Sequence, residues 1–256
     1  MTALTHALDR TILIRASPEI VFRYFTDSTR WAAWWGAGSF IEARPGGEMR
    51  IRYPDGSEAV GTVLEVAPVE RIVFTYGYAT GQMIPPGGSR VTIRLDPDTD
   101  GTRLVLTHAF ADASARDHHV QGWRYQLSLF SNVVVNELLA NVSDAVDAWF
   151  EAWAIENERQ REAAFAGIAI PSVEFRDKFS VVAGIDELTP HVGAAQRFMP
   201  GMHLERVGTV RQCQGTALAD WLAVGADGQP RASGTNVFVF DAGARARITS
   251  VVGLWN

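Results

Sequence analysis

The sequence predicts an α+β protein, and three features of the chain support this fold class. Residues 44–76 alternate short runs rich in β-branched and aromatic residues with two turn signals that contain Pro and Gly, at 45–47 and 54–56. This pattern is typical of a β-meander, in which antiparallel strands follow one another through tight turns. Apolar residues at steps of three or four along residues 123–138 predict a long helix. After residue 143, a helical pattern is followed by strand patterns for a second time.

Length and composition predict two packed domains. A chain of 256 residues can form one large domain or two ordinary ones. Because the character of the sequence changes near residue 142, we expect one domain at residues 1–142 and another at residues 143–256. The hydrophobic fraction of 47% and the charged fraction of 20% suit two domains with ordinary apolar cores.

The net charge and the length of the apolar stretches argue against several classes of partner. A formal net charge of −6 disfavours binding to nucleic acid or to anionic membranes, so we expect neither as a partner. No stretch is long and apolar enough to span a bilayer. Residues 1–6 lack the pattern of a signal peptide, and the single Cys213 cannot form an internal disulfide. We therefore expect a cytoplasmic protein.

The remaining elements of the N-terminal domain follow from local patterns. We expect, in order, a strand at 11–14, a helix from Pro18 with Ser17 as its cap, a short helix holding Trp31 and Trp34, and strands near 89–95 and 103–110. Ser114 and Asp117 have the spacing of a capping box and are expected to begin the long helix. Its apolar stripe should face the sheet.

A cavity between the long helix and the sheet is expected to be lined by aromatic side chains. The candidates for contact with a small ligand are Trp35, Tyr53, Tyr76, Tyr78, His108 and Trp123. A mostly apolar pocket with a few polar tips is typical of small-ligand sites. The alternative for each residue is core packing without a ligand. His118 and His119 would point about 100° apart on a helix, so they do not form a metal pair.

Five short motifs occur in one order along this domain. They are Trp34-Trp35-Gly36, Arg44-Pro45-Gly46-Gly47, Pro54-Asp55-Gly56, Gly61-Thr62-Val63-Leu64-Glu65-Val66 and Glu70-Arg71-Ile72-Val73-Phe74-Thr75. With them, residues 8–140 resemble the SRPBCC (START-like) superfamily, and within it the family named after the activator of the heat-shock-protein-90 ATPase. The resemblance implies a helix-grip fold, an antiparallel sheet around a long C-terminal helix with a cavity between them.

The second domain is expected to begin with a helix capped by Ser143 that carries Trp149 and Trp153. The later motifs are Val173-Glu174-Phe175-Arg176-Asp177, Val182–Leu188, Met199-Pro200-Gly201-Met202, the strand 215–224 and the ending 236–252. In this order they resemble the nuclear transport factor 2-like, or SnoaL-like, superfamily. The resemblance implies an α+β cone-like barrel, helices closed by a bent mixed sheet around a pocket.

Asp177 is the candidate catalytic residue. Strand alternation places it on the apolar face that Val173 and Phe175 share, and a carboxylate in apolar surroundings is a stronger base. Resemblance to ketosteroid isomerase implies a base here and places Asn236 near its oxyanion-hole acid. The second oxyanion donor of that enzyme, a Tyr on the first helix, is absent. The alternative role for Asp177 is structural, capping the next loop or pairing with a neighbouring cation.

Further candidates for ligand contact in the second domain are Trp149, Trp153, Asp220 and Asn236. Three functions remain open: binding of a small hydrophobic or aromatic molecule in the two cavities, an enzyme of the polyketide cyclase, isomerase or dehydratase type with Asp177 as general base, and a co-chaperone or dimerising interaction protein. We expect no cofactor and no metal. A homodimer through the C-terminal domain is one assembly that the resemblance allows.

Overall fold

A computed structural model describes residues 3–243 and 245–256 of the chain. Residues 1–2 of the expected N-terminal domain and residue 244 of the C-terminal one lie outside the described part. The chain divides into two compact units, Met1–Glu137 and Leu138–Asn256. Within the described residues, no helix has both the length and the apolar character that crossing a bilayer requires.

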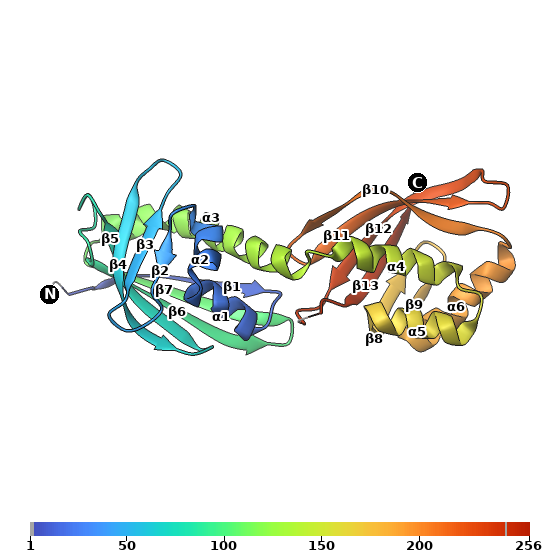
Figure 1. The fold of residues 1–256 in the computed structure, drawn as a ribbon, viewed down its shortest axis with the longest axis horizontal. Helices are drawn as coiled ribbons and strands as arrows, with labels where there is room; N and C mark the ends of the chain where they lie inside the picture. Colours follow the sequence, from blue (N-terminus) through green and yellow to red (C-terminus); the bar gives the residue numbers. More distant parts are fainter. Residues whose placement is uncertain (1–2, 244) are drawn as a thin grey trace. The chain divides into compact units, whose positions relative to one another are not determined.

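The N-terminal unit is a seven-stranded antiparallel sheet with a long helix (Figure 1). Its elements are β1 His6–Ile14, α1 Pro18–Thr26, α2 Ser28–Trp35, β2 Phe40–Ile41, β3 Glu48–Arg52, β4 Glu58–Ala67, β5 Arg71–Tyr78, β6 Ser89–Asp98, β7 Gly101–Phe110 and α3 Ala113–Leu138. The strand order is β1-β7-β6-β5-β4-β3-β2, so the predicted meander forms and the first strand closes the far edge beside β7. Strand β1 begins five residues earlier than predicted, because His6 onward pairs with β7 from Phe110 back to Thr102.

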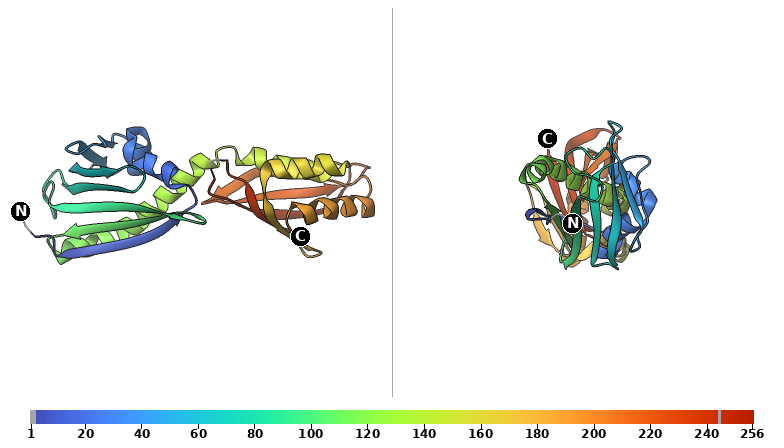
Figure 2. Two further views of the ribbon diagram at one scale, coloured as in Figure 1. Left: turned by 90° about the horizontal axis from the view of Figure 1, so that it is seen from below. Right: turned by 90° about the vertical axis from the view of Figure 1, so that its left-hand side faces the viewer.

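Helix α3 buries one stripe, which is what a helix gripped by a sheet requires. Trp123, Leu127, Phe130 and Val134 on this helix are all buried. Figure 2 shows the helix running along the sheet. The predicted helix-grip fold is therefore confirmed for this unit.

Two predicted helix caps are wrong, each by two residues. Helix α3 begins at Ala113, and the Asp112 carboxylate accepts a hydrogen bond from the Ala115 N–H at 2.9 Å, so Asp112 and not Ser114 caps the helix. In the second unit, helix α4 begins at Val142 after Asn141, which places the predicted cap Ser143 inside the helix. At α3 the Asp112 side chain satisfies a free N–H group that Ser114 was expected to cap, whereas Asn141 makes no side-chain cap at α4, so spacing alone does not select the cap.

The C-terminal unit is a six-stranded mixed sheet with three helices (Figure 1). Its elements are α4 Val142–Ala154, α5 Glu158–Ile168, β8 Ala169–Arg176, β9 Val181–Ala183, α6 Ile185–Phe198, β10 His203–Cys213, β11 Thr216–Val224, β12 Pro230–Phe240 and β13 Ile248–Trp255. The strand order is β10-β11-β12-β13-β8-β9, and the pair β13–β8 is parallel whereas the other pairs are antiparallel. This arrangement confirms the predicted α+β cone.

A buried arginine holds the helices of this unit together. Arg161 on α5 is 2% exposed, and its guanidinium donates to the backbone oxygens of Thr189 on α6 and of Ile155 and Glu156 at the α4–α5 connection. It also donates to the side-chain oxygen of Gln196 on α6. A planar guanidinium can satisfy several acceptors in fixed directions, which a lysine cannot do. Arg161 thereby fixes α6, which forms part of a cavity wall described below.

A chain of buried hydrogen bonds joins α3 to the sheet of the N-terminal unit. The Trp123 indole N–H donates to His108 Nδ1 at 2.9 Å. His108 Nε2 lies 2.8 Å from the Ser89 hydroxyl, which donates to the backbone oxygen of Tyr76 at 2.9 Å. Because an indole can only donate, Nδ1 must accept and Nε2 must carry the proton of a neutral ring. Burial, reinforced by the nearby His119, lowers the pKa of His108 well below its ordinary value of 6.5.

We predict that His108 makes the N-terminal unit less stable in mild acid. The folded unit holds His108 neutral, whereas in the unfolded chain its pKa is about 6.5. The unfolded state therefore binds more protons as the pH falls below 6.5, and stability decreases from there toward the lower folded pKa, by about 1.4 kcal/mol per pH unit. Urea unfolding of the N-terminal unit, followed through its indole NMR signals at pH 7.0 and 5.5, measures this slope.

His108→Gln can keep both hydrogen bonds without a titrating group, so it should lower the slope by one proton. The wild-type protein measured in parallel is the control. An unchanged slope in His108→Gln would contradict the assignment.

Candidate functional site

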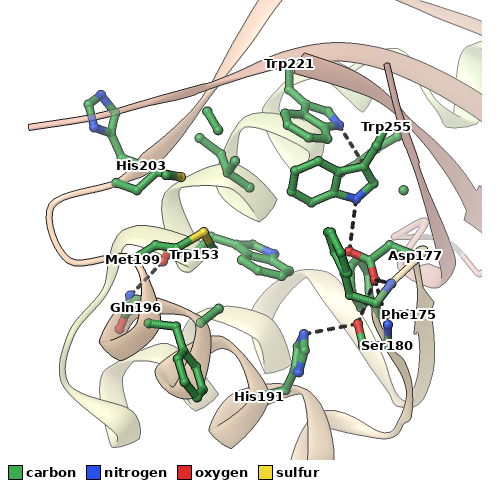
Figure 3. Close-up of a pocket in the computed structure, with 18 residues that line it drawn as sticks. Trp153, Phe175, Asp177, Ser180, His191, Gln196, Met199, His203, Trp221 and Trp255 are labelled. Atoms are coloured by element: carbon green, nitrogen blue, oxygen red, sulfur yellow. Dashed lines mark hydrogen bonds between the residues drawn. The ribbon is translucent and has the colours of Figure 1, made fainter. Parts of the chain in front are cut away.

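The C-terminal unit contains a cavity of about 520 Å³ with a largely aromatic wall. This volume lies within the range of about 300–1,000 Å³ that is usual for small-molecule sites. Figure 3 shows the cavity and the side chains around it. Its lining includes Trp153, Phe175, Asp177, Phe179, Ser180, His191, Gln196, Met199, Met202, His203, Trp221, Asn236, Gly253 and Trp255.

Four separate elements bring the aromatic wall together. Trp153 comes from the last turn of α4, Phe175 from β8, Trp221 from β11 and Trp255 from β13. The Trp221 and Trp255 rings meet edge to face, with centroids 5.0 Å apart. Trp221 lies so close to Gly234 on β12 that a Cβ there would stand 2.4 Å from its ring. The ring position therefore depends on the glycine beneath it.

Asp177 lies at the cavity wall and has a different environment at each carboxylate oxygen. Oδ1 accepts from the backbone N–H groups of Phe179 and Ser180, at 2.8 and 2.9 Å, and from the Ser180 hydroxyl at 2.9 Å. Oδ2 accepts one bond, from the Trp255 indole N–H at 3.2 Å. A carboxylate oxygen has two lone pairs. Oδ1 is thus saturated and anchors the turn after β8, whereas Oδ2 retains a lone pair for a ligand or for a proton.

Ser180 connects Asp177 to His191 on α6. The Ser180 hydroxyl donates to Asp177 Oδ1, and its oxygen lies 3.3 Å from His191 Nε2. Since that hydroxyl proton is committed to the carboxylate, His191 Nε2 must donate to the serine oxygen. The order is histidine, serine, aspartate, with serine in the middle (Figure 3). A serine nucleophile requires a histidine that accepts its proton, so these three residues are not a hydrolase triad.

Asn236 on β12 supplies a directed donor to the same cavity. Its side chain is 5% exposed, and its Oδ1 accepts from the Trp221 indole N–H at 3.0 Å. Because an indole can only donate, the atom that faces Trp221 must be the amide oxygen of Asn236. The amide N–H₂ group has no hydrogen-bond partner among residues 3–243 and 245–256. Gly253 separates Asn236 from Asp177: a Cβ there would lie 3.2 Å from Asp177 Cβ and 3.3 Å from Asn236 Oδ1. The two side chains therefore flank one small residue.

The structure brings together some of the residues predicted for this unit and separates others. Trp153, Asp177 and Asn236 line the cavity. Trp149 does not: it is fully buried and packs on Phe165 and Phe238 as a core residue. Asp220 does not either, because its face of β11 carries an ion pair with Arg211 and a bond to Thr235.

Sequence reasoning missed most of the cavity residues, among them Ser180, His191, Trp221 and Trp255. His191 lies on a helix that starts eight residues after the Asp177 turn, and no local spacing links the two. Ser180 follows Asp177 by three residues, which is the spacing of a side-chain-capped turn and is the one signal that could have identified it. Trp221 and Trp255 reach the cavity through strand pairing that the sequence does not show.

The N-terminal unit has a cavity of its own, of about 420 Å³. Five of the six predicted residues line it: Trp35, Tyr53, Tyr76, Tyr78 and Trp123. The sixth, His108, is fully buried and lies behind the wall, where it holds the indole of Trp123. His119, which was not among the candidates, is part of the lining.

The polar groups of this second cavity are held in their uncharged forms. Burial, the largest cause, raises the pKa of Tyr53 and that of Tyr76 above the ordinary value of 10. Burial also lowers the pKa of His119. Its Nδ1 lies 2.7 Å from the backbone oxygen of Ala115 and must donate to it, so Nε2 of the neutral ring accepts. No group of three or more His, Cys, Asp or Glu side chains in the described part of the chain could hold a metal ion.

Comparison with known proteins identifies the first domain. Residues 15–134 match the family described as Activator of Hsp90 ATPase homolog 1-like protein (AHSA1). A solved AHSA1-like protein from Rhizobium etli is 31% identical over 50% of this chain and 81% of its own, with a TM-score of 0.42. None of the curated proteins matches.

Two other solved structures are similar to the chain. One is a putative isomerase of the SnoaL-like family from Agrobacterium tumefaciens, 21% identical, covering 44% of this chain and 95% of its own with a TM-score of 0.42. The other is an Aha1 dimer from Colwellia psychrerythraea, 18% identical, covering 48% of this chain and 91% of its own with a TM-score of 0.43. The chain therefore belongs to the AHSA1 family through residues 15–134.

Proposed function

We propose that the protein binds a small, largely apolar molecule in the cavity of its C-terminal unit. The observation that carries this proposal is the roughly 520 Å³ aromatic cavity with few polar atoms in its wall. Both folds in the chain are of ligand-binding or isomerase type. Aromatic walls supply apolar contact area, and a few placed polar groups orient the ligand. Asp177 Oδ2 and the free amide of Asn236 are those groups here.

We predict that filling the cavity abolishes ligand binding. Ala195 on α6 lines the cavity, whereas its neighbour Ala194 does not. Ala195→Phe should displace the ligand because its ring would occupy the space, and Ala194→Phe is the matched control. Native mass spectrometry of freshly purified protein, followed by denaturing small-molecule analysis, should show an adduct in the wild type and in Ala194→Phe only. Equal occupancy in both variants would contradict the site.

The same spectra report the oligomeric state. A homodimer through the C-terminal domain is part of the proposal, and a monomer at micromolar protein concentration would remove that part without affecting the cavity.

A specific observation also favours a second function, proton transfer at a carbon next to a carbonyl group. Asp177 Oδ2 keeps a free lone pair, the Asn236 N–H₂ group has no partner within the described residues, and both side chains line the same cavity. In this reaction Oδ2 takes a proton from carbon, the electrons of the broken C–H bond move to the carbonyl oxygen, and the Asn236 amide donates to the resulting enolate. Return of the proton to another carbon gives an isomerase, and loss of a neighbouring hydroxyl gives a dehydratase.

We predict that Asp177→Asn removes this activity while the fold persists. A ketone that fits the cavity, 2-tetralone, reports the first step without knowledge of the natural substrate, since its α-hydrogens exchange for deuterium in D₂O. NMR should show exchange accelerated by the wild-type protein and slowed about 100-fold or more in Asp177→Asn, the usual contribution of a general base. Asp220→Asn is the control, because Asp220 lies outside the cavity. Acceleration that survives in Asp177→Asn would remove this residue from the chemistry.

A further inference from the structure

We propose that the ligand of the C-terminal cavity is an uncharged, flat ring compound that carries an N–H donor next to a carbonyl group, as a lactam does. This inference rests on the proposed function, binding of a small apolar molecule in that cavity. It adds the polar edge that the ligand must present, and it follows from the hydrogen-bonding groups that the cavity leaves free.

Two groups in the wall are free to bond a ligand, and they are of opposite kinds. Asp177 Oδ2 accepts one hydrogen bond, from Trp255, and keeps a second lone pair. The Trp221 indole occupies the oxygen of Asn236, so this side chain is left with its N–H₂ group, which can only donate. The wall thus offers one acceptor and one donor. A ligand that satisfies both must supply a donor and an acceptor in return.

The other polar side chains of the lining already have partners. They are Ser180, His191, Gln196 and His203, and each has a hydrogen bond to another side chain. The free acceptor of Asp177 and the free donor of Asn236 therefore decide which polar edge the ligand needs.

The two free groups stand on either side of Gly253 on β13. Asp177 follows β8 and Asn236 lies on β12, and β13 runs between these two strands. A Cβ at Gly253 would lie 3.2 Å from Asp177 Cβ and 3.3 Å from Asn236 Oδ1, so both side chains approach the glycine from opposite sides. A donor and an acceptor on neighbouring atoms of one ring edge can meet both groups. The N–H and the carbonyl of a lactam have this arrangement, because ring closure holds them on one edge.

The wall favours a ligand without net charge. The described lining contains Asp177 and no other Asp, Glu, Lys or Arg side chain. Its carboxylate accepts four hydrogen bonds, and the Lys178 ammonium lies 4.8 Å from the centre of the Trp255 ring that donates one of them. An anionic ligand would meet the carboxylate, and a cationic one would lose its hydration close to a second cation.

Aromatic rings give the rest of the cavity its shape (Figure 3). Trp221 and Trp255 meet edge to face, and so do Trp153 and Phe175, whose centroids are 5.4 Å apart. Ring pairs of this kind present both faces and edges to a ligand, and a flat ring system can pack on either.

Three bicyclic probes of nearly equal size separate the polar edge from the apolar body. 3,4-Dihydroquinolin-2(1H)-one carries the lactam N–H and carbonyl, 2-tetralone has CH₂ in place of the N–H, and tetralin lacks both groups. Each is titrated into the full-length ¹⁵N-labelled protein at pH 7, and the indole N–H signal of Trp153 follows binding. Trp153 lines the cavity, and its indole bonds neither Asp177 nor Asn236.

The three affinities should fall in a fixed order. The lactam should bind about tenfold more tightly than 2-tetralone, the effect expected of one hydrogen bond to a charged group. 2-Tetralone should bind about fivefold more tightly than tetralin, the usual effect of one neutral hydrogen bond. Tetralin has no polar group, so its binding tests the proposed function alone.

Two variants assign the groups. Asp177→Asn puts a donor in place of Oδ2 and should weaken the lactam about tenfold while 2-tetralone and tetralin bind as before. Asn236→Leu removes the amide donor and should weaken the lactam and 2-tetralone about fivefold each, with tetralin unchanged. Asp220→Asn, outside the cavity, is the control and should change none of the affinities.

The affinity for tetralin shows whether the cavity persists in each variant, because a merely structural role of either residue would weaken this probe too. Should Asp177→Asn fail to fold, the wild-type series and Asn236→Leu decide.

The inference is overturned if tetralin binds and the lactam binds no more tightly than 2-tetralone. It is also overturned if the preference for the lactam survives in Asp177→Asn, or if 2-tetralol, whose hydroxyl donates and accepts through one atom, binds as tightly as the lactam. These outcomes leave the proposed apolar binding site standing. A Trp153 signal that responds to none of the probes would reject both proposals.

Discussion

Hydrogen bonds from indole N–H groups to side-chain acceptors hold three of the rings at the two cavities, whereas the buried N–H groups of Trp35, Trp149 and Trp153 have no acceptor among the described residues. Trp123 donates to His108, Trp221 to Asn236 and Trp255 to Asp177. An indole can only donate, and a buried donor without a partner costs about 1–3 kcal/mol. Each acceptor therefore fixes the plane of a large ring, and the rings held in this way leave space beside them. Each acceptor also uses one of its lone pairs for the indole N–H. The hydrogen-bonding groups that it has left are those that a ligand can meet.

The polar groups that remain free to contact a ligand differ between the two cavities. In the C-terminal cavity, the indoles occupy Asn236 Oδ1 and one position on Asp177 Oδ2, so an amide donor and a carboxylate lone pair remain. In the N-terminal cavity, the Trp123 indole is held from behind by His108, and the lining contains tyrosine hydroxyls, two histidines and the Gln126 amide but no Asp, Glu, Lys or Arg. One chain thus carries a cavity with a carboxylate in its wall and a cavity whose lining has no carboxylate. Similar ring-rich walls do not imply similar ligands.

The fold was largely predictable from the sequence, because strands, turns and helix stripes are local patterns. The order of motifs indicated both domains, and the buried stripe of α3 followed from its spacing. The residues that line the cavities were less predictable. His108 and Trp149 belong to the same residue classes as true lining residues, yet packing places them behind the wall and in the core. His191, Trp221 and Trp255 reach Asp177 only through the pairing of β8 with β13 and the packing of α6. Gly234 leaves room for the Trp221 ring because it has no Cβ. Nothing in the neighbouring sequence indicates that this glycine has that role.

The two roles considered for Asp177 are compatible because they use different oxygens. Oδ1 holds the turn after β8 through three hydrogen bonds, which is the structural role. Those bonds orient the carboxylate, so Oδ2 meets the cavity in one direction and with one indole N–H beside it. A base held in this way needs little reorganisation when it takes a proton, and such preorganisation is what makes a catalytic group effective. The structural anchoring of Asp177 through Oδ1 is therefore compatible with the proposed chemistry at Oδ2.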